Sequence, residues 1–300
     1  MDVGALVLTI IAPVFILASV GFCWARLGND YPSEFLSKLV MNVGAPCLFL
    51  STMTSSGIQL QVLGEVVVAA VLVLALMGVI GWILISRLGL KTTVYLPPLL
   101  FPNNGNMGLS LCLYTFGEEG LALALGIFMV MAVMQFTVGV MIADENAPSP
   151  LNGLINALGQ PVVLASFASV ACIALDYRLP EWLFRSVSLM GQFTIPIMLL
   201  TLGVSLSHLS VKNMRSAVLL SLMRLGGGFM AGVAVAELLG FEGAARGVVI
   251  LQSTMPAAVF NYLIAVRYKG SPSEVAGVVV TSTVMSFATL PFVIAYLINY

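Results

Sequence analysis

Long apolar stretches separated by short polar interruptions run along the whole chain. About ten of them approach the roughly 20 residues that an α-helix needs to cross the hydrocarbon core of a bilayer. The pattern predicts membrane-spanning helices at residues 4–26, 35–54, 65–87, 93–117, 119–143, 154–176, 181–207, 212–238, 243–267 and 272–298. None of the interruptions is long enough to fold as a soluble domain. The sequence therefore predicts an all-α polytopic membrane protein.

The composition agrees with this fold class and excludes several classes of function. Of the 300 residues, 60% are hydrophobic and only 8% are charged, a balance that soluble domains of this size do not show. The formal net charge of −1 leaves no basic surface of the kind that binds nucleic acid. The four cysteines form no ligand-spaced pair, and the single histidine, His208, offers no metal cluster. We expect no metal site and no cofactor.

The segment Leu99–Gly120 interrupts its apolar stretch with residues that loosen a helix. Pro102, Gly105 and Gly108 weaken the helical backbone. Three amide side chains lie beside them in the sequence, those of Asn103, Asn104 and Asn106. At membrane depth, free backbone groups and amides are tolerated where they line a cavity inside the protein. We interpret the segment as a discontinuous helix that carries a binding site; the alternative is a kinked helix whose asparagines only bond to neighbouring helices.

The predicted span 243–267 contains a second interruption. Its polar and helix-breaking residues are Gln252, Ser253, Thr254, Pro256 and Asn261. Because proline has no N–H and frees the carbonyl one turn before it, the helix is expected to open between Ser253 and Pro256. Two opened helices that cross near the midplane would direct N-terminal ends at the crossing. The free N–H groups and positive dipole ends there favour an anionic group.

The two halves of the chain share proline and glycine positions at a nearly constant separation. Pro13 corresponds to Pro161, Pro46 to Pro196, and Gly117 to Gly270. This indicates a duplicated unit of about five helices, and because five is odd, the second copy would enter the membrane in the opposite orientation. The polar loop 144–150 is the natural boundary. We therefore expect an N-terminal repeat at residues 1–148 and an inverted C-terminal repeat at residues 149–300.

Lysine and arginine are distributed unevenly among the loops, and basic loops are retained on the cytoplasmic side. If the N-terminus is outside, the outward loops hold Arg178, Arg185 and Arg246. The inward loops then hold Arg26, Lys38, Arg87, Lys91, Lys212, Arg215, Arg267 and Lys269. The asymmetry predicts that both termini are extracytoplasmic in a multi-pass protein of the cell membrane.

Three short motifs carry a resemblance to a known family. They are LSKLVMNVGAPCLFLS at residues 36–51, NNGNMGLSL at residues 103–111 and MPAAVFNYLIAVRY at residues 255–268. They resemble the second, fourth and ninth helices of the auxin efflux carrier family, which includes plant PIN-like carriers and many bacterial permeases. The likeness covers the whole chain. One departure is Ser110, which stands where the fourth-helix pattern has proline, so Pro102 is expected to open that helix in part.

The resemblance implies a fold similar to that of sodium/proton antiporters and bile-acid symporters, with a scaffold domain and a crossover domain. It implies that Asn103 and Asn261 are the amides nearest the substrate carboxylate and that Pro256 is the crossover proline of the ninth helix. It also implies a small organic anion as substrate, such as malate, malonate or an auxin-like acid. A homodimer is favoured by the same likeness.

Three further polar residues are candidates for supporting the site or a coupling ion. Gln135 is consistent with an interhelical hydrogen bond, which we favour, and with a substrate or ion contact. Gln252 adjoins the break in the ninth span. Arg224 is predicted to lie near one end of the eighth span and to reach the cytoplasmic headgroups; the alternative is a cation that meets the anionic substrate. The sequence leaves coupling to H⁺ or Na⁺ open.

These features favour a secondary transporter that moves a small organic anion by alternating access. The candidate substrate-binding residues are Asn103, Asn104, Gly105, Asn106, Ser253, Pro256 and Asn261. A channel or sensory receptor on the same bundle is the alternative. An intramembrane enzyme is disfavoured, because Ser110 has only His208 as a base and His208 is expected near the membrane surface. The expected partners are the substrate, the lipid bilayer and a second copy of the chain, without nucleic acid.

Overall fold

Helices account for nearly all of the chain that the computed structural model describes, which is residues 3–143, 150–209, 213–268 and 271–299. No β-strand occurs in these ranges. The α-helices are α1 (Val3–Arg26), α2 (Ser33–Leu39), α3 (Ala45–Ser55), α4 (Leu60–Arg87), α5 (Thr92–Leu100), α6 (Leu109–Met134), α7 (Val140–Ala143), α8 (Pro150–Leu158), α9 (Pro161–Ala174), α10 (Glu181–Gln192), α11 (Thr194–His208), α12 (Met214–Leu222), α13 (Gly228–Leu238), α14 (Gly243–Ser253), α15 (Val259–Arg267) and α16 (Pro272–Asn299). Short π-helical segments join some of them: η1 (Val40–Gly44), η2 (Asn104–Gly108), η3 (Gln135–Gly139) and η4 (Met223–Gly227). The predicted all-α class is confirmed.

Seven helical runs are long and apolar enough to cross a membrane. They are Val3–Arg26, Ser33–Ser55, Leu60–Arg87, Asn104–Ala143, Glu181–His208, Met214–Leu238 and Pro272–Asn299. The protein is thus a polytopic membrane protein. The number of ten crossings and the inverted repeat remain predictions, and the boundary at residues 148 and 149 lies outside the described residues, as does Gly270.

The run Asn104–Ala143 has 40 residues, which is too long for one crossing. Within it, Gly117 has a φ of 67°, so the chain turns sharply there. This left-handed conformation is open to glycine at no steric cost. The turn lies at the boundary that the sequence predicts between the fourth and fifth spans.

The prediction of one continuous sixth span at residues 154–176 is wrong. The structure divides it into α8, which ends at Leu158, and α9, which begins at Pro161. Proline is favourable in the first turn of a helix, but inside a helix it removes a hydrogen bond and clashes with the preceding turn. Pro161 therefore starts a new helix here.

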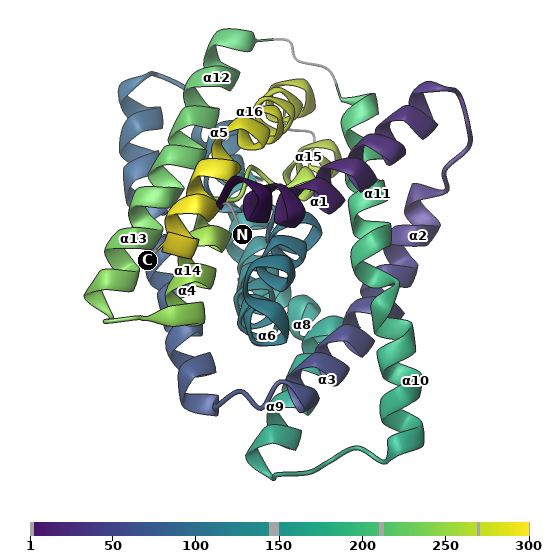
Figure 1. Cartoon of the computed structure of the whole chain (residues 1–300). Coiled ribbons are helices and arrows are strands. Elements are labelled where there is room, and N and C mark those ends of the chain that lie inside the picture. Colours follow the sequence, from purple (N-terminus) through teal and green to yellow (C-terminus); the bar gives the residue numbers. More distant parts are fainter. Residues whose placement is uncertain (1–2, 144–149, 210–212, 269–270, 300) are drawn as a thin grey trace.

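The helices form two groups that face each other (Figure 1). One group contains α1 packed against α11, and α3 packed against α9 and α10. The other contains α4, α12, α13 and α16 around the broken helices α5–α6 and α14–α15. Of the predicted spans, the first (α1) packs on the seventh (α11), and the second (α3) packs on the sixth (α9). An exchange of this kind between halves is what an inverted repeat would produce.

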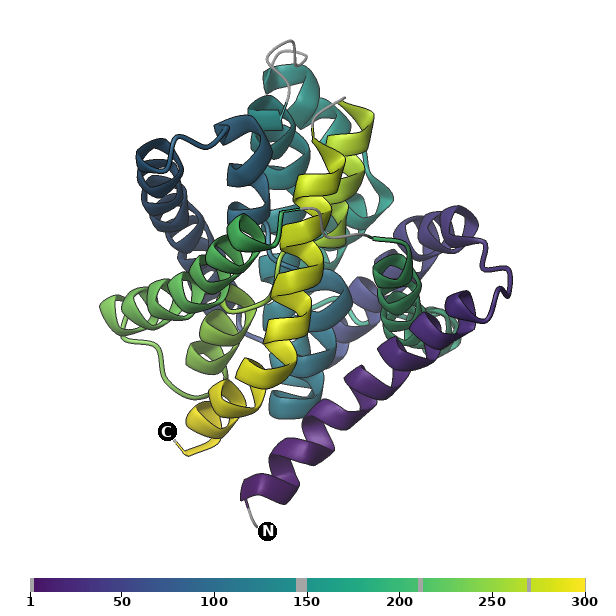
Figure 2. The same ribbon diagram turned by 90° about the horizontal axis from the view of Figure 1, so that it is seen from above.

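The first and last described residues lie at the same end of the molecule (Figure 2). Leu6 of α1 and Leu297 of α16 also line a common cavity. Termini at one end require an even number of crossings. That both termini are extracytoplasmic stays a prediction from the loop charges.

The membrane orientation can be tested with reporters. A reporter that works only in the cytoplasm should be silent when it is fused after Tyr300 and active when it is inserted beside Arg215, because basic loops are retained inside. Activity of both fusions would show that an even number of crossings, and not the predicted three, separates Arg215 from the C-terminus. The reverse pattern would place both termini in the cytoplasm.

The α1–α11 crossing depends on two glycines. A Cβ added to Gly21 would overlap the carbonyl oxygen of Leu200, and one added to Gly203 would overlap that of Ala18. The backbones of α1 and α11 therefore touch directly, which is how small residues let membrane helices approach closely.

Gly203→Ala should lower the stability of the purified protein by about 1–3 kcal/mol, because the overlap must be relieved by moving α1 or α11. Gly64→Ala is the matched control. Gly64 lies in α4 with no atom near its added Cβ, so alanine there should gain up to about 1 kcal/mol of helix propensity. Thermal unfolding in detergent measures both; equal melting temperatures would contradict the close crossing.

Candidate functional site

Two helices are interrupted where the sequence predicts, and the two interruptions lie against each other. The first ends with α5 at Leu100, is non-helical over residues 101–103 and resumes at Asn104. The second ends with α14 at Ser253, is non-helical over residues 254–258 and resumes at Val259. Pro102 and Pro256 lie inside the two breaks. Ser110, at the position of the family proline, lies inside regular α6.

The two non-helical segments bond to each other and form the crossover. The N–H of Asn103 donates to the carbonyl oxygen of Pro256 at 2.7 Å, and the N–H of Ala258 donates to that of Phe101 at 3.1 Å. Between them, Pro102 and Ala257 form an antiparallel bridge. The pairing satisfies backbone groups that the breaks release, which is essential where no water replaces them.

A side chain from the last helix adds a bond that the sequence did not point to. The N–H of Ala257 donates to Oγ of Ser282 on α16 at 3.1 Å. Ser282 is fully buried. The only signal in the sequence is a short polar stripe in the predicted last span, which is equally consistent with helix packing.

Asn261 joins the two broken helices through its side chain. This differs from its predicted role as an amide that binds the substrate carboxylate. Its Nδ2 donates to the carbonyl oxygens of Phe101 at 3.0 Å and Ala258 at 3.1 Å. Its Oδ1 accepts a hydrogen bond of 3.0 Å from Nε2 of Gln135 on η3. Gln135 thus makes the interhelical bond that we favoured. Because both amide hydrogens of Asn261 are engaged, donation to a carboxylate would require that these bonds be exchanged.

A pocket of about 200 Å³ lies between the crossover and the opposite group of helices. Its crossover wall consists of Asn103, Asn104, Gly105 and Asn106 on one broken helix and residues 258–260 on the other. Its opposite wall consists of Ser37, Val40, Met41, Met198, Thr201 and Ser205. Phe101, Phe128 and Phe136 make much of the remainder apolar. No charged side chain lines the pocket among the residues that the structure describes.

The crossover wall is built from the starts of two helices. The first N–H groups of a helix have no partner inside it, and the helix end carries about half a positive charge. Asn103 adds Nδ2, which is buried without a hydrogen-bond partner among the described residues, in a residue only 3% exposed. The amide of Asn104 is likewise unpartnered at both atoms. The pocket therefore presents unsatisfied donors and positive helix ends to its interior.

Three other predicted site residues lie on the far side of the crossover. Ser253, Gln252 and Arg224 line a separate cavity of about 10 Å³ that Asn104 also reaches. The amide of Gln252 has no partner among the described residues. A Cβ added to Gly108 would overlap Oε1 of Gln252, so the glycine is needed to seat this amide.

The predicted position of Arg224 is wrong. Its side chain does not extend to the headgroups, since the residue is 1% exposed and packed inside the bundle. It also does not line the larger pocket, so it cannot meet a substrate there in this conformation. The sequence placed Arg224 near a span end by counting residues, which reveals nothing about the direction of its side chain.

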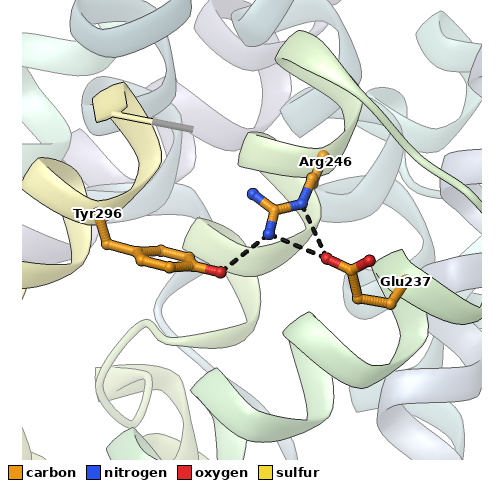
Figure 3. A network of polar contacts seen from close by, with 3 residues as sticks. All are labelled: Glu237, Arg246 and Tyr296. Atoms are coloured by element: carbon orange, nitrogen blue, oxygen red, sulfur yellow. Dashed lines mark hydrogen bonds and ion pairs between the residues drawn. The ribbon is translucent and has the colours of Figure 1, made fainter.

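A partly buried arginine that has a carboxylate partner gives a contrast with Arg224. Arg246 of α14 donates from Nη2 to Oε1 of Glu237 at 3.0 Å and to the hydroxyl oxygen of Tyr296 at 2.9 Å, where α13, α14 and α16 meet (Figure 3). The side chain of Glu237 is 62% exposed. This ion pair lies outside the 200 Å³ pocket.

Comparison with known proteins agrees with this architecture. A family model described as "Membrane transport protein" matches residues 6–152 and 150–294. The chain is 22% identical over 294 residues to an "Uncharacterized transporter" of Methanocaldococcus jannaschii, covering 92% of this chain and 94% of that protein. It is 25% identical over 223 residues to a "Putative malonate transporter" of Rhizobium meliloti, covering 70% and 69%. The chain therefore belongs to the membrane transport protein family, which the motifs of its second, fourth and ninth spans already indicate.

Proposed function

We propose that this protein is a secondary transporter that moves a small organic anion across the cell membrane by alternating access. The observation that carries the proposal is the pocket of about 200 Å³ at the N-terminal ends of two broken helices that cross inside the helix bundle. Broken helices of this kind form midplane sites in many secondary transporters. A channel remains the alternative, and the experiment below separates the two.

An anion in this pocket would be held without a cationic side chain. Each of the two helix ends supplies about half an elementary charge and contributes about 0.3–2 kcal/mol. Asn103 adds an unpartnered amide donor. Together these interactions suit a carboxylate at micromolar to millimolar affinity, about 4–8 kcal/mol, which also permits release.

Alternating access would use the two walls of the pocket. The crossover wall moves with α6 and α15, whereas the opposite wall belongs to α2, η1 and α11. The two walls approach each other at Gly105, where the atom of the opposite wall nearest to an added Cβ is Cε of Met198, the end of a side chain on α11. Side-chain ends adjust more easily than backbone, so the wall of α11 can slide past the crossover without unfolding it.

The relative from Rhizobium meliloti makes malonate the first compound to test. The largely apolar lining also suits an anion with one carboxylate and an apolar body. We therefore propose that malonate, malate and an aromatic monocarboxylate be compared as ligands. Their order of affinity would show whether a second charge is tolerated in a pocket that lacks a cationic side chain.

Counterflow in proteoliposomes tests the proposed function. Vesicles loaded with unlabelled anion should take up the labelled anion faster than empty vesicles, and uptake should saturate. Thermal stabilisation of the purified protein by the same anion gives an independent measure of binding. Uptake that neither saturates nor shows counterflow would identify a channel, and the absence of binding by any organic anion would contradict the proposal.

A further inference from the structure

Arg224 is the one buried charged side chain in the described part of the chain. It lies in the π-helical segment η4, between α12 and α13. No carboxylate lies within ion-pair distance in the described residues. A buried, unpaired cation at membrane depth is costly, so its surroundings must compensate the charge in another way.

The compensation comes from the ends of the two broken helices. Nη1 of Arg224 donates to the carbonyl oxygen of Leu99, and Nη2 donates to that of Ser253. Leu99 lies in the last turn of α5, and Ser253 is the last residue of α14. The last carbonyls of a helix have no partner inside it, and each helix end carries about half a negative charge. Two such ends together balance one guanidinium.

Two glycines of α13 make room for this arginine beside the end of α14. A Cβ added to Gly228 would overlap the carbonyl oxygen of Ser253, the same oxygen that accepts from Arg224. A Cβ added to Gly232 would press on Ile250 and Ser253. The glycines bring α13 onto the end of α14 and thereby place the planar guanidinium between the two helix ends. This accounts for part of the three-glycine run 226–228, which is not a phosphate-binding loop.

We propose that Arg224 is the resident counter-cation of the crossover. It supplies from within the chain the positive charge that the ends of α5 and α14 require. The carbonyl oxygens of Leu99 and Ser253 are thereby engaged by the guanidinium and are not free to bind a metal cation. The Nε of Arg224 has no partner among the described residues. Arg224 also lines the 10 Å³ cavity together with Asn104 and Gln252, and that cavity has room for about one water molecule.

Two consequences follow from this assignment. The crossover needs no bound Na⁺ to stay assembled, and Arg224 is a positioning residue that fixes the two breaks and thus the pocket on their other side. The second consequence rests on the proposed transport function. The first is independent of any substrate, so its test can fail while organic-anion transport stands.

The test compares the melting temperatures of the purified substrate-free protein in choline, sodium and low-millimolar guanidinium chloride at equal ionic strength. The wild type should melt at the same temperature in all three. Arg224→Ala should melt at a lower temperature in choline, and guanidinium should recover part of the loss by filling the vacated position. Arg246→Ala is the matched control, because its guanidinium is paired with the carboxylate of Glu237 and does not lie at the crossover, so its loss should show no recovery specific to guanidinium.

Arg224→Lys provides a second variant if the alanine variant does not accumulate. The ammonium of lysine keeps the charge but lacks the planar guanidinium that reaches two carbonyl oxygens. The melting temperature of Arg224→Lys should therefore also be lower than that of the wild type. The proposal is overturned if Arg224→Lys has the same melting temperature as the wild type. It is likewise overturned if guanidinium helps Arg224→Ala no more than Arg246→Ala, or if Na⁺ stabilises the wild type over choline.

Discussion

Asn103→Asp is expected to abolish binding of an organic anion, whereas Asn103→Gln is expected to weaken it only in part. Asn103 opens the helix that starts at the pocket, and its Nδ2 is buried without a partner among the described residues. Aspartate would place a negative charge beside the bound carboxylate. At a separation of 4 Å and an effective dielectric constant of 20, the repulsion is about 4 kcal/mol. That corresponds to about three orders of magnitude in affinity.

Glutamine keeps the amide donor but moves it by one methylene. The expected loss is that of one misplaced hydrogen bond, about 1 kcal/mol. The change should therefore be less than tenfold in the dissociation constant. The backbone bond from Asn103 to Pro256 is retained in both variants, so the crossover itself should survive.

Isothermal titration with malonate measures both variants, and thermal unfolding without ligand shows whether they fold. Asn299→Asp is the control, because Asn299 lies at the end of α16, is not among the residues that line the pocket, and donates from Nδ2 to the carbonyl oxygen of Ala295 in its own helix. Its affinity should match that of the wild type. Unchanged binding by Asn103→Asp would move the site elsewhere or show that the ligand is not anionic.

Local sequence signals predicted the breaks well. Pro102 and Pro256 cannot continue a hydrogen-bonded helix, and both lie in the observed non-helical segments. Gly117, at the predicted junction of two spans, adopts the left-handed conformation that glycine allows. Four consecutive residues, Asn103–Asn106, could be placed at the pocket because they adjoin one break.

Side-chain partners across the bundle could not be predicted in the same way. The family resemblance implied that Asn261 lies nearest the substrate carboxylate, but the direction of its side chain is set by Phe101 and Gln135, which lie far away in the sequence. Arg224 was expected to reach the headgroups because it lies near one end of its predicted span, where a long charged side chain can extend to the interface. The carbonyls that compensate its charge, those of Leu99 and Ser253, become available only when both helices break and cross. This compensation depends on tertiary structure, so the residues next to Arg224 in the sequence do not indicate it.

Gly228→Ala and Gly226→Ala should have effects of opposite sign although the two glycines are neighbours in one run. Gly228 faces the end of α14, where a Cβ would overlap the carbonyl oxygen of Ser253 and approach Nη2 of Arg224. Gly226 has no atom near its added Cβ. Alanine at position 228 should thus force α13 away from α14, at about 1–3 kcal/mol or more, since backbone adjusts less readily than a side-chain end.

The same substitution should disturb transport beyond its effect on stability. If α13 moves, the guanidinium of Arg224 can no longer donate to both Leu99 and Ser253, and the two breaks lose their common anchor. Gly226→Ala keeps that anchor and should gain up to about 1 kcal/mol from helix propensity. Melting temperatures in detergent and counterflow rates measured on the folded fraction separate these effects. A Gly228→Ala protein with wild-type melting and transport would show that α13 does not pack on the end of α14 as the structure describes.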